Sequence, residues 1–178
     1  PEMNAIFSGL VAMGKNVQFA EIDGVRVHAG NAYKADTLRV PEGYMVVTVE
    51  CAVAGTASEV RIDHHQEGDA GYGLPADRYL DGSSIGQLIN FLVAGGESRQ
   101  VVEAAFGGMS FIKLVAASDH CPAHALQGKC PGVSAEDVLQ FRAENKATFL
   151  KKDVAVIVTE LKEAAMYVAS MPRITVGE

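Results

Sequence analysis

Apolar and polar residues recur along the chain with two different periods, and each period predicts a different kind of element. In the N-terminal part, the spacing predicts a helix over Asn4–Met13 and then two strands, Val17–Glu21 and Val25–His28, which an Asp-Gly pair joins as a hairpin. The nearly continuous apolar run Tyr44–Cys51 is typical of a strand that is buried on both faces. A second strand is expected at Glu59–Ile62.

The rest of the chain shows mainly the period of amphipathic helices. Residues 68–82 contain four glycines and a proline, which predict a loop. A capping box that begins at Ser84 then opens a helix with one apolar face, and a Gly-Gly pair ends it. Further helices are expected over Ser98–Phe106, Phe111–Ser118, Ser134–Leu150 and Asp153–Ser170, with the start of a strand at Ile174–Val176.

Buried strands that are followed by helices favour an α/β fold. We therefore expect residues 1–178 to form a single α/β domain with a largely parallel sheet, flanking helices and an N-terminal hairpin. The length supports one domain, because 178 residues can bury a sizeable core without disulfides. Apolar residues make up 48% of the chain and charged residues 21%, which is typical of a globular protein rather than a disordered one.

The composition also limits where the protein is expected to work. No apolar run approaches the ~20 residues that span a bilayer, so we expect no membrane partner. The first residues carry no basic segment or apolar signal core, which argues against export. Three cysteines, an odd and low number, indicate a reducing compartment, so a cytoplasmic location is expected.

The charge limits the classes of partner. A net charge of −7 argues against binding to duplex nucleic acid, which needs clustered lysines and arginines. A small anionic substrate or ligand is compatible with this charge if a metal supplies positive charge locally. The strand start at Ile174–Val176 leaves a homo-oligomer as an open alternative, because another segment could complete the sheet.

The densest chemistry in the chain lies between Val60 and Asp69, where Asp63, His64 and His65 follow the second predicted strand directly. Adjacent imidazoles and carboxylates are costly to desolvate unless something pairs with them. Ligands collect at the carboxyl ends of strands in open α/β sheets, and imidazole with carboxylate suits divalent transition metals. We expect a divalent metal here, Mn²⁺, Zn²⁺ or Mg²⁺; the alternative is a polar loop whose histidines bond to the backbone.

Other acidic and histidine side chains are candidates for the same site. Glu50 ends the strongest predicted strand, beside the strand that carries Asp63 if the two are neighbours. Asp119 and His120 directly follow a predicted helix, and they are candidates for a metal ligand and for a ligand or general acid, respectively. Two loop acids, Glu67 and Asp69, either orient the histidines or are simply solvated.

Two further motifs have alternative interpretations. Ser83 and Ser84 open a helix whose N-terminus can bind a phosphate, although plain helix capping explains a serine there equally well. Cys121, His124 and Cys130 surround His120 like a zinc site, but Pro122 interrupts the helix, and the cysteine spacing is not that of a zinc knuckle. A structural role, or a disulfide between the two cysteines, is the other interpretation of that segment.

A strand that ends in Asp63-His64-His65, followed by a loop and a helix that starts at Ser83-Ser84, resembles the DHH phosphoesterase family over Tyr44–Leu92. That family includes single-strand exonucleases, phosphodiesterases of oligonucleotides and cyclic dinucleotides, and manganese pyrophosphatases. The resemblance implies that Asp63 and His64 belong to a metal site and that His65 faces the substrate phosphate. The family's N-terminal Asp-x-Asp metal motif is not found in this chain, and Glu50-Cys51 stands where the preceding strand usually ends in Asp.

The function expected from these observations is metal-dependent hydrolysis of a phosphoester or phosphoanhydride in a nucleotide-like small molecule. Asp63, His64, Glu50 and Asp119 are the expected metal ligands. His65 and His120 are the expected catalytic residues, and Ser83 and Ser84 are expected to bind the substrate. Two alternatives stay open: a non-enzymatic protein that binds a small anion or nucleotide, and a metal-dependent hydrolase of a non-phosphate substrate.

Overall fold

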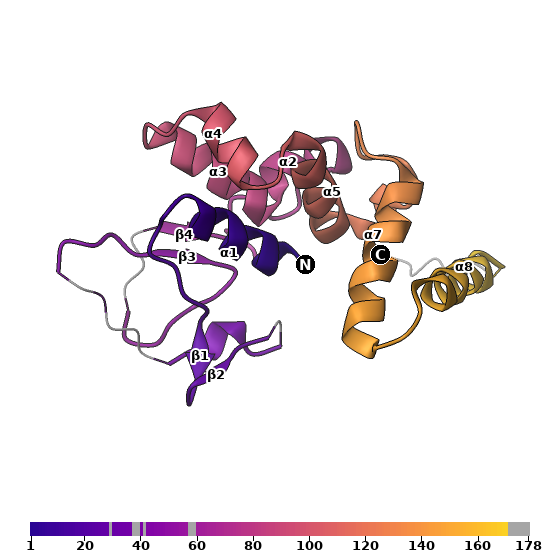
Figure 1. Cartoon of the computed structure of the whole chain (residues 1–178), viewed down its shortest axis with the longest axis horizontal. Coiled ribbons are helices and arrows are strands. Elements are labelled where there is room, and N and C mark those ends of the chain that lie inside the picture. The colour runs from indigo at the N-terminus through magenta and orange to yellow at the C-terminus, as the bar shows by residue number, and fades with distance from the viewer. Residues whose placement is uncertain (29, 37–39, 41, 57–59, 171–178) are drawn as a thin grey trace, which may run out of the picture.

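Helices predominate in the computed structural model, which describes residues 1–28, 30–36, 40, 42–56 and 60–170 (Figure 1). The longer helices are α1 (Glu2–Ala12), α3 (Ser84–Ala94), α4 (Arg99–Ala105), α5 (Met109–His120), α7 (Ala135–Leu150) and α8 (Val154–Ser170). The short helices are α2 (Tyr79–Gly82), α6 (Pro122–Ala125) and the 3-10 turns η1 (Ala32–Lys34) and η2 (Ala76–Arg78). The strands are β1 (Glu21–Ile22), β2 (Val25–Arg26), β3 (Val47–Val49) and β4 (Val60–Ile62).

The expected α/β fold with a largely parallel sheet is wrong. The described residues contain only two sheets of two strands each, an antiparallel pair β1–β2 and a parallel pair β3–β4. Only Val47–Val49 of the predicted strand Tyr44–Cys51 pairs, and Tyr44 and Met45 are more than half exposed. An apolar run predicts burial on two faces, but it does not show whether a wide sheet exists to provide those faces.

The local predictions fared better than the architecture. The Asp-Gly turn of the hairpin is confirmed, with Ile22 paired to Val25 and with Asp23 and Gly24 at φ values of 51° and 75°. The strands are shorter than predicted: residues 17–20 form no strand, and the pairing covers only Glu21–Ile22 and Val25–Arg26. The predicted helices are confirmed within a few residues of their ends. Residues 68–82, predicted as a loop, contain η2 and α2. The strand expected at Ile174–Val176 lies outside the described residues.

The main core is built by helices that pack on one another, with α5 at its centre. Ile112 and Val115 of α5 are each 1% exposed, and they belong to one cluster with Ile6 of α1, Ile85 of α3 and Val138 of α7. β3 and β4 lie against this helical layer beside α1 (Figure 1). The sheet therefore forms one flank of a helical core, and its strand ends point toward α5.

No single helix among the described residues is long and apolar enough to cross a membrane. The bent pair α4 and α5, with an angle of 67° between the helices, meets the length and composition requirements only when the two are taken together.

We expect Ile112→Ala to lower the free energy of unfolding by roughly 2–5 kcal/mol, because it leaves a cavity at the centre of the core. Urea denaturation followed by circular dichroism measures the change. Phe149→Ala is the matched control: this side chain lies on α7 but is 85% exposed, so its change should stay within about 0.5 kcal/mol. Equal losses for the two variants would contradict the assignment of the core.

Candidate metal centre

The parallel pairing of β3 with β4 places two acidic residues at the same end of the sheet. Val49 pairs with Ile62, so Glu50 and Asp63 are the next residues of their strands. Glu50 has a φ of 52°, a left-handed conformation that turns the chain out of the strand, while its N–H donates to the carbonyl of Ile62 at 3.0 Å. Two strands that end together thus deliver Glu50 and the Asp63-His64-His65 sequence to one place.

Four potential metal ligands meet there, because the end of α5 approaches the strand ends. One ligand atom from each of Glu50, His64, His65 and Asp119 lies within 4.8 Å of the other three. His64 is the most enclosed, with its side chain 5% exposed, and its Nε2 lies 3.2 Å from Asp119 Oδ2 and 3.8 Å from Glu50 Oε1. Carboxylate and imidazole groups at these separations can hold a divalent metal ion.

The backbone fixes the orientation of His64. Its Nδ1 lies 3.1 Å from the carbonyl oxygen of Gly82, which can only accept, so the Nδ1–H donates. The neutral ring then presents the Nε2 lone pair to Asp119 and Glu50, as a metal-binding histidine does. Burial acts to lower the pKa of His64, but the hydrogen bond and charge of Asp119, together with Glu50, outweigh burial and hold this pKa above its ordinary value.

Asp63 lies beside the four-residue group and organises it. Its fully buried carboxylate accepts from the N–H groups of His64 and His65 at 2.7 and 3.2 Å, and from Nδ1 of His65 at 2.9 Å. Tyr33 and Arg61 donate to its other oxygen at 2.8 and 3.2 Å. Burial acts to raise the pKa of Asp63, but these hydrogen bonds lower it overall. With its oxygens used in this way, Asp63 orients His65; its expected role as a metal ligand stays a prediction.

Glu2 is a neighbour of the group that the sequence analysis missed. It lies at the start of α1 and is 1% exposed; its Oε1 accepts from the N–H of Ile85 at 2.8 Å, whereas its Oε2 has no partner. Burial, and then the charges of Asp119 and Glu50, raise the pKa of Glu2 well above its ordinary value. Periodicity could not reveal this residue, because an acid in the first turn of a helix is normally exposed and stabilises the helix dipole.

His120 packs against the site but faces partly away from it. Its ring centroid lies 5.2 Å from that of His64, and its Nε2 lies 2.9 Å from the carbonyl oxygen of Leu74. Burial lowers the pKa of His120, so the ring is neutral near pH 7. Gly82 makes room for it, since a Cβ at Gly82 would lie 2.5 Å from the His120 ring. The structure brings His120 to the site, and its catalytic role stays a prediction.

Ser83 and Ser84 are both fully buried at the start of α3. The hydroxyl of Ser83 accepts from the N–H of Gly86 at 3.2 Å, which is helix capping, and the hydroxyl of Ser84 has no partner. The next N–H, that of Ile85, already donates to the Glu2 carboxylate. The carboxylate of Glu2 therefore occupies part of this helix terminus. Substrate binding by Ser83 and Ser84 stays a prediction.

The remaining candidates lie apart from the group. Sγ atoms of Cys121 and Cys130 lie 3.0 Å from each other, both buried, while His124 is exposed. Among the described residues, the group around His64 is the one set of three or more potential ligands, so the alternative zinc site is not assembled. Asp69 forms an ion pair with Arg61, in which Oδ1 of Asp69 lies 3.1 Å from a guanidinium nitrogen. Glu67 is exposed.

Comparison with protein-family models, with curated proteins and with solved structures finds no match for this chain. The resemblance to the DHH phosphoesterases thus stands on the motif residues alone. The geometry supports one expectation from this resemblance, metal binding at the motif, since His64, His65, Glu50 and Asp119 form a group that can bind a metal.

In the metal-free protein, we expect His64 to titrate above pH 6.5 and His120 below it. Asp119 stabilises the imidazolium of His64, whereas burial disfavours the imidazolium of His120. NMR of the ring C–H signals measures both midpoints, with His64→Gln and His120→Gln used to assign them. Because the folded-state pKa of His64 is raised, its contribution to stability is complete below its ordinary pKa and is lost as pH rises through the folded value.

The control is Asp119→Asn, which removes the negative charge that faces His64. It should lower the titration midpoint of His64, because burial lowers this pKa and the charge of Asp119 no longer raises it. Midpoints in the reverse order in the parent protein would contradict the geometry described for the two rings.

Proposed function

We propose that the chain binds a divalent metal through Glu50, His64 and Asp119, with His65 beside the ion to act on the substrate, and uses the metal to hydrolyse a phosphoester or phosphoanhydride in a nucleotide-like small molecule. The observation that carries the proposal is the convergence of potential ligand atoms of these four residues within 4.8 Å of one another, at the end of two parallel strands.

The charges around the site support a cation. Glu2, Glu50 and Asp119 are close enough that each raises or lowers the pKa of a neighbour, and Arg61 is held by Asp63 and Asp69 instead. Glu2 Oε2 and Glu50 Oε1 are buried without a hydrogen-bond partner. Buried carboxylate oxygens without donors are costly, and a divalent ion would satisfy them. The donor set therefore fits a metal.

The ligand types favour some metals over others. Imidazole together with carboxylates suits Mn²⁺ and Zn²⁺ better than Mg²⁺, which binds oxygen ligands and retains several waters. Glu2 lies close enough to the group that Asp119 and Glu50 raise its pKa, and it can add a further oxygen ligand when it loses its proton. We therefore propose Mn²⁺ or Zn²⁺ as the resident ion.

The side chains have distinct roles in this mechanism. When bound, the metal supplies Lewis acidity and lowers the pKa of water at the site. The carbonyl of Gly82 holds His64 in its ligating tautomer, and Asp63 fixes the His65 ring through Nδ1. The His65 side chain is 48% exposed, so it is the member of the group that a substrate can reach, and it would stabilise charge or move a proton at the substrate phosphate.

The alternatives differ in what they require of this site. The excess of carboxylates disfavours a protein that binds anions without metal, because Glu50 and Asp119 would repel the ligand. A hydrolase of a non-phosphate substrate uses the same metal, so only substrate turnover separates it from the phosphoesterase.

We expect the purified protein to bind Mn²⁺ or Zn²⁺ at the group around His64. His64→Ala or Asp119→Asn should abolish that binding. Asp63→Asn and Glu2→Gln should weaken it by about 10–100-fold, because they act on the orientation and charge of the ligands rather than remove them. Isothermal titration calorimetry with each metal chloride measures the affinities.

His124→Ala is the matched control, since this histidine is exposed and lies outside the group, and it should bind metal like the parent protein. Binding that survives His64→Ala but is lost in His124→Ala would place the metal elsewhere.

We expect the metal-loaded protein to hydrolyse bis-(p-nitrophenyl) phosphate or pyrophosphate and to lose this activity on chelation, with recovery when Mn²⁺ or Zn²⁺ is restored. His65→Gln should reduce kcat with a much smaller effect on metal affinity, since the half-exposed ring acts on substrate in the proposed mechanism. A protein that binds metal tightly at His64 but turns over neither phosphate compound would refute the phosphoesterase and leave the non-phosphate hydrolase as the next candidate.

A further inference from the structure

Two buried thiols face each other immediately after the helix that carries Asp119. Sγ of Cys121 lies 3.0 Å from Sγ of Cys130, about 1 Å more than the ~2.05 Å of a disulfide bond. The two residues are 8% and 2% exposed, and among the described residues neither belongs to a group of three or more potential metal ligands. Two thiols in such a position either fill space in the core or are the precursor of a disulfide.

The backbone between the two cysteines folds back on itself. Cys121 ends α5 and begins α6 directly. After α6, Gly128 turns the chain at a φ of 71°, and the N–H of Lys129 donates to the carbonyl of His124 at 3.0 Å. This turn returns Cys130 to the start of α6. The local backbone therefore sets the separation of the two sulfurs, in addition to side-chain packing.

Contacts from other elements fix both ends of this segment. On one side, Arg142 of α7 donates to the carbonyl of Ser118, in the last turn of α5, at 2.7 Å. On the other side, the hydroxyl of Tyr79 donates to the carbonyl of Pro131 at 2.9 Å. Both cysteines also belong to the main core cluster. The folded chain thus brings the thiols together without a bond between them, which is the geometric condition for forming one.

The environment of the thiols disfavours a catalytic role. Reactive cysteines are partly exposed and lie beside positive charge. Here burial, and then the neighbouring Cys130, raise the pKa of the Cys121 thiol to about 12. The other hydrogen bond of the Cys121 sulfur is a long one, of 3.9 Å, to the carbonyl oxygen of Ala117. Thiols held in this way suit the slow formation of a bond within the protein better than attack on a substrate.

We propose that Cys121 and Cys130 are a site of reversible oxidation, at which a small peroxide joins the two sulfurs in a disulfide that fixes the end of α5. Cys121 is the more exposed of the two and reacts first. Its thiol gives up its proton, and the sulfur attacks one oxygen of hydrogen peroxide. The O–O bond breaks, the other oxygen leaves as water with the proton of the thiol, and Cys121 becomes a sulfenic acid.

The second step closes the bond. The sulfur of Cys130 attacks the sulfenic sulfur of Cys121, the S–O bond breaks, and the hydroxide leaves as water with the proton of the Cys130 thiol. Two thiols and one hydrogen peroxide thus yield one disulfide and two waters, and two electrons pass from the sulfurs to the peroxide. A dithiol reductant reverses the oxidation, so the bond can be transient in a reducing compartment.

The test oxidises the folded full chain and locates the bond by mass spectrometry. The protein is reduced, freed of reductant, incubated with hydrogen peroxide for hours, and then denatured, alkylated and digested with trypsin. Trypsin cuts after Lys129, so a bond between Cys121 and Cys130 joins two otherwise separate peptides, residues 114–129 and 130–142. We expect this linked pair of peptides, and we expect the number of alkylated cysteines to fall from three to one.

Oxidation should also stabilise the fold, because the bond restricts the unfolded chain between residues 121 and 130. The Tm should rise by about 5 °C and fall back after treatment with dithiothreitol. Neither readout involves a metal or a phosphate substrate, so the result is independent of the proposed function.

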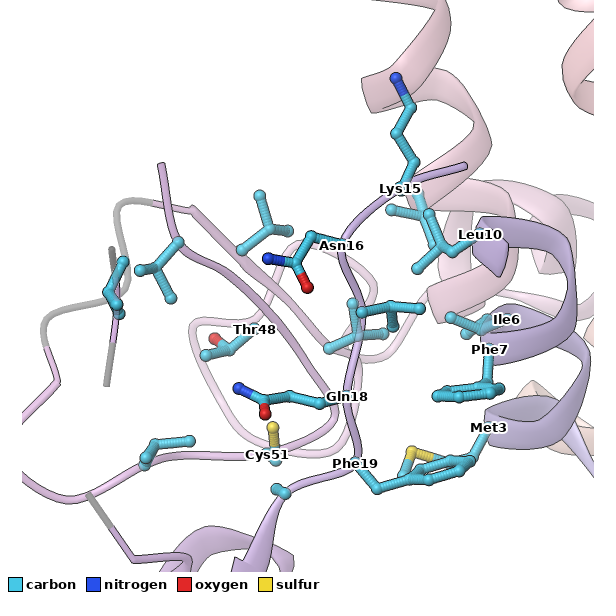
Figure 2. A pocket seen from close by; sticks show the side chains of 18 of the residues that line it. Met3, Ile6, Phe7, Leu10, Lys15, Asn16, Gln18, Phe19, Thr48 and Cys51 are labelled. Atoms are coloured by element: carbon cyan, nitrogen blue, oxygen red, sulfur yellow. The ribbon is translucent and has the colours of Figure 1, made fainter. Parts of the chain in front are cut away.

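The third cysteine provides the matched control. Cys51 is half-buried and lines a cavity of about 740 Å³ together with Gln18 and Thr48 (Figure 2). Cys121 and Cys130, which the structure also describes, do not line this cavity. Cys51→Ser should therefore leave the linked peptides and the rise in Tm unchanged. Cys121→Ser and Cys130→Ser should each abolish both.

The exposed side chain of Met166 reports whether the peroxide dose is sufficient, since methionine is oxidised to the sulfoxide. The proposal is overturned if no linked peptides form at a dose that oxidises Met166, or if they occur only in dimers on a non-reducing gel. It is also overturned if the linked chain shows no rise in Tm, because the bond would then not fix the end of α5. A rise in Tm that persists in both serine variants would overturn it as well, since the stabilisation would have another cause.

Discussion

The parallel register of β3 and β4 is the constraint on which the candidate metal centre depends. Because Val49 stands opposite Ile62, Glu50 and Asp63 leave the sheet at the same level and on the same side of α5. A slip of one residue would send alternate side chains to the opposite face and separate Glu50 from His64. The bond from the Glu50 N–H to Ile62 closes the ladder at the point where the chemistry begins. Three residues of each strand are enough to set this register because the helical core holds both strands in place.

The charges of the centre follow from an unequal distribution of donors. Asp63 receives hydrogen bonds from two backbone N–H groups and three side chains, and its pKa falls although it is fully buried. Glu2 and Glu50 each keep a buried oxygen without a donor. The protein thus supplies all the hydrogen-bond donors that Asp63 needs, whereas Glu2 and Glu50 each have an oxygen that a cation could contact. This division explains why Asp63 orients ligands whereas Glu50 and Asp119 can act as ligands themselves.

The sequence predicted the site better than it predicted the architecture, for physical reasons. The period of 3.6 is a local property, so helices such as α3 and α7 were found near their observed ends. The width of a sheet depends on pairing between distant segments, and the apolar run Tyr44–Cys51 carries no information on how many strands lie beside it. Glu50, His64, His65 and Asp119 could be selected because their side chains suggest metal binding wherever they lie. Glu2 could not, since its burial depends on contacts with Ile85 and Asp119 far along the chain.

The bond between Glu2 and Ile85 has a consequence for the order in which the protein assembles. The two residues are 83 positions apart, and the carboxylate is buried only when α1, α3 and the end of α5 are together. Closing such long loops is slow compared with forming the helices themselves. The metal centre should therefore be among the last parts of the molecule to form during folding, and the helices α3 and α5 can be in place before a site exists for the ion.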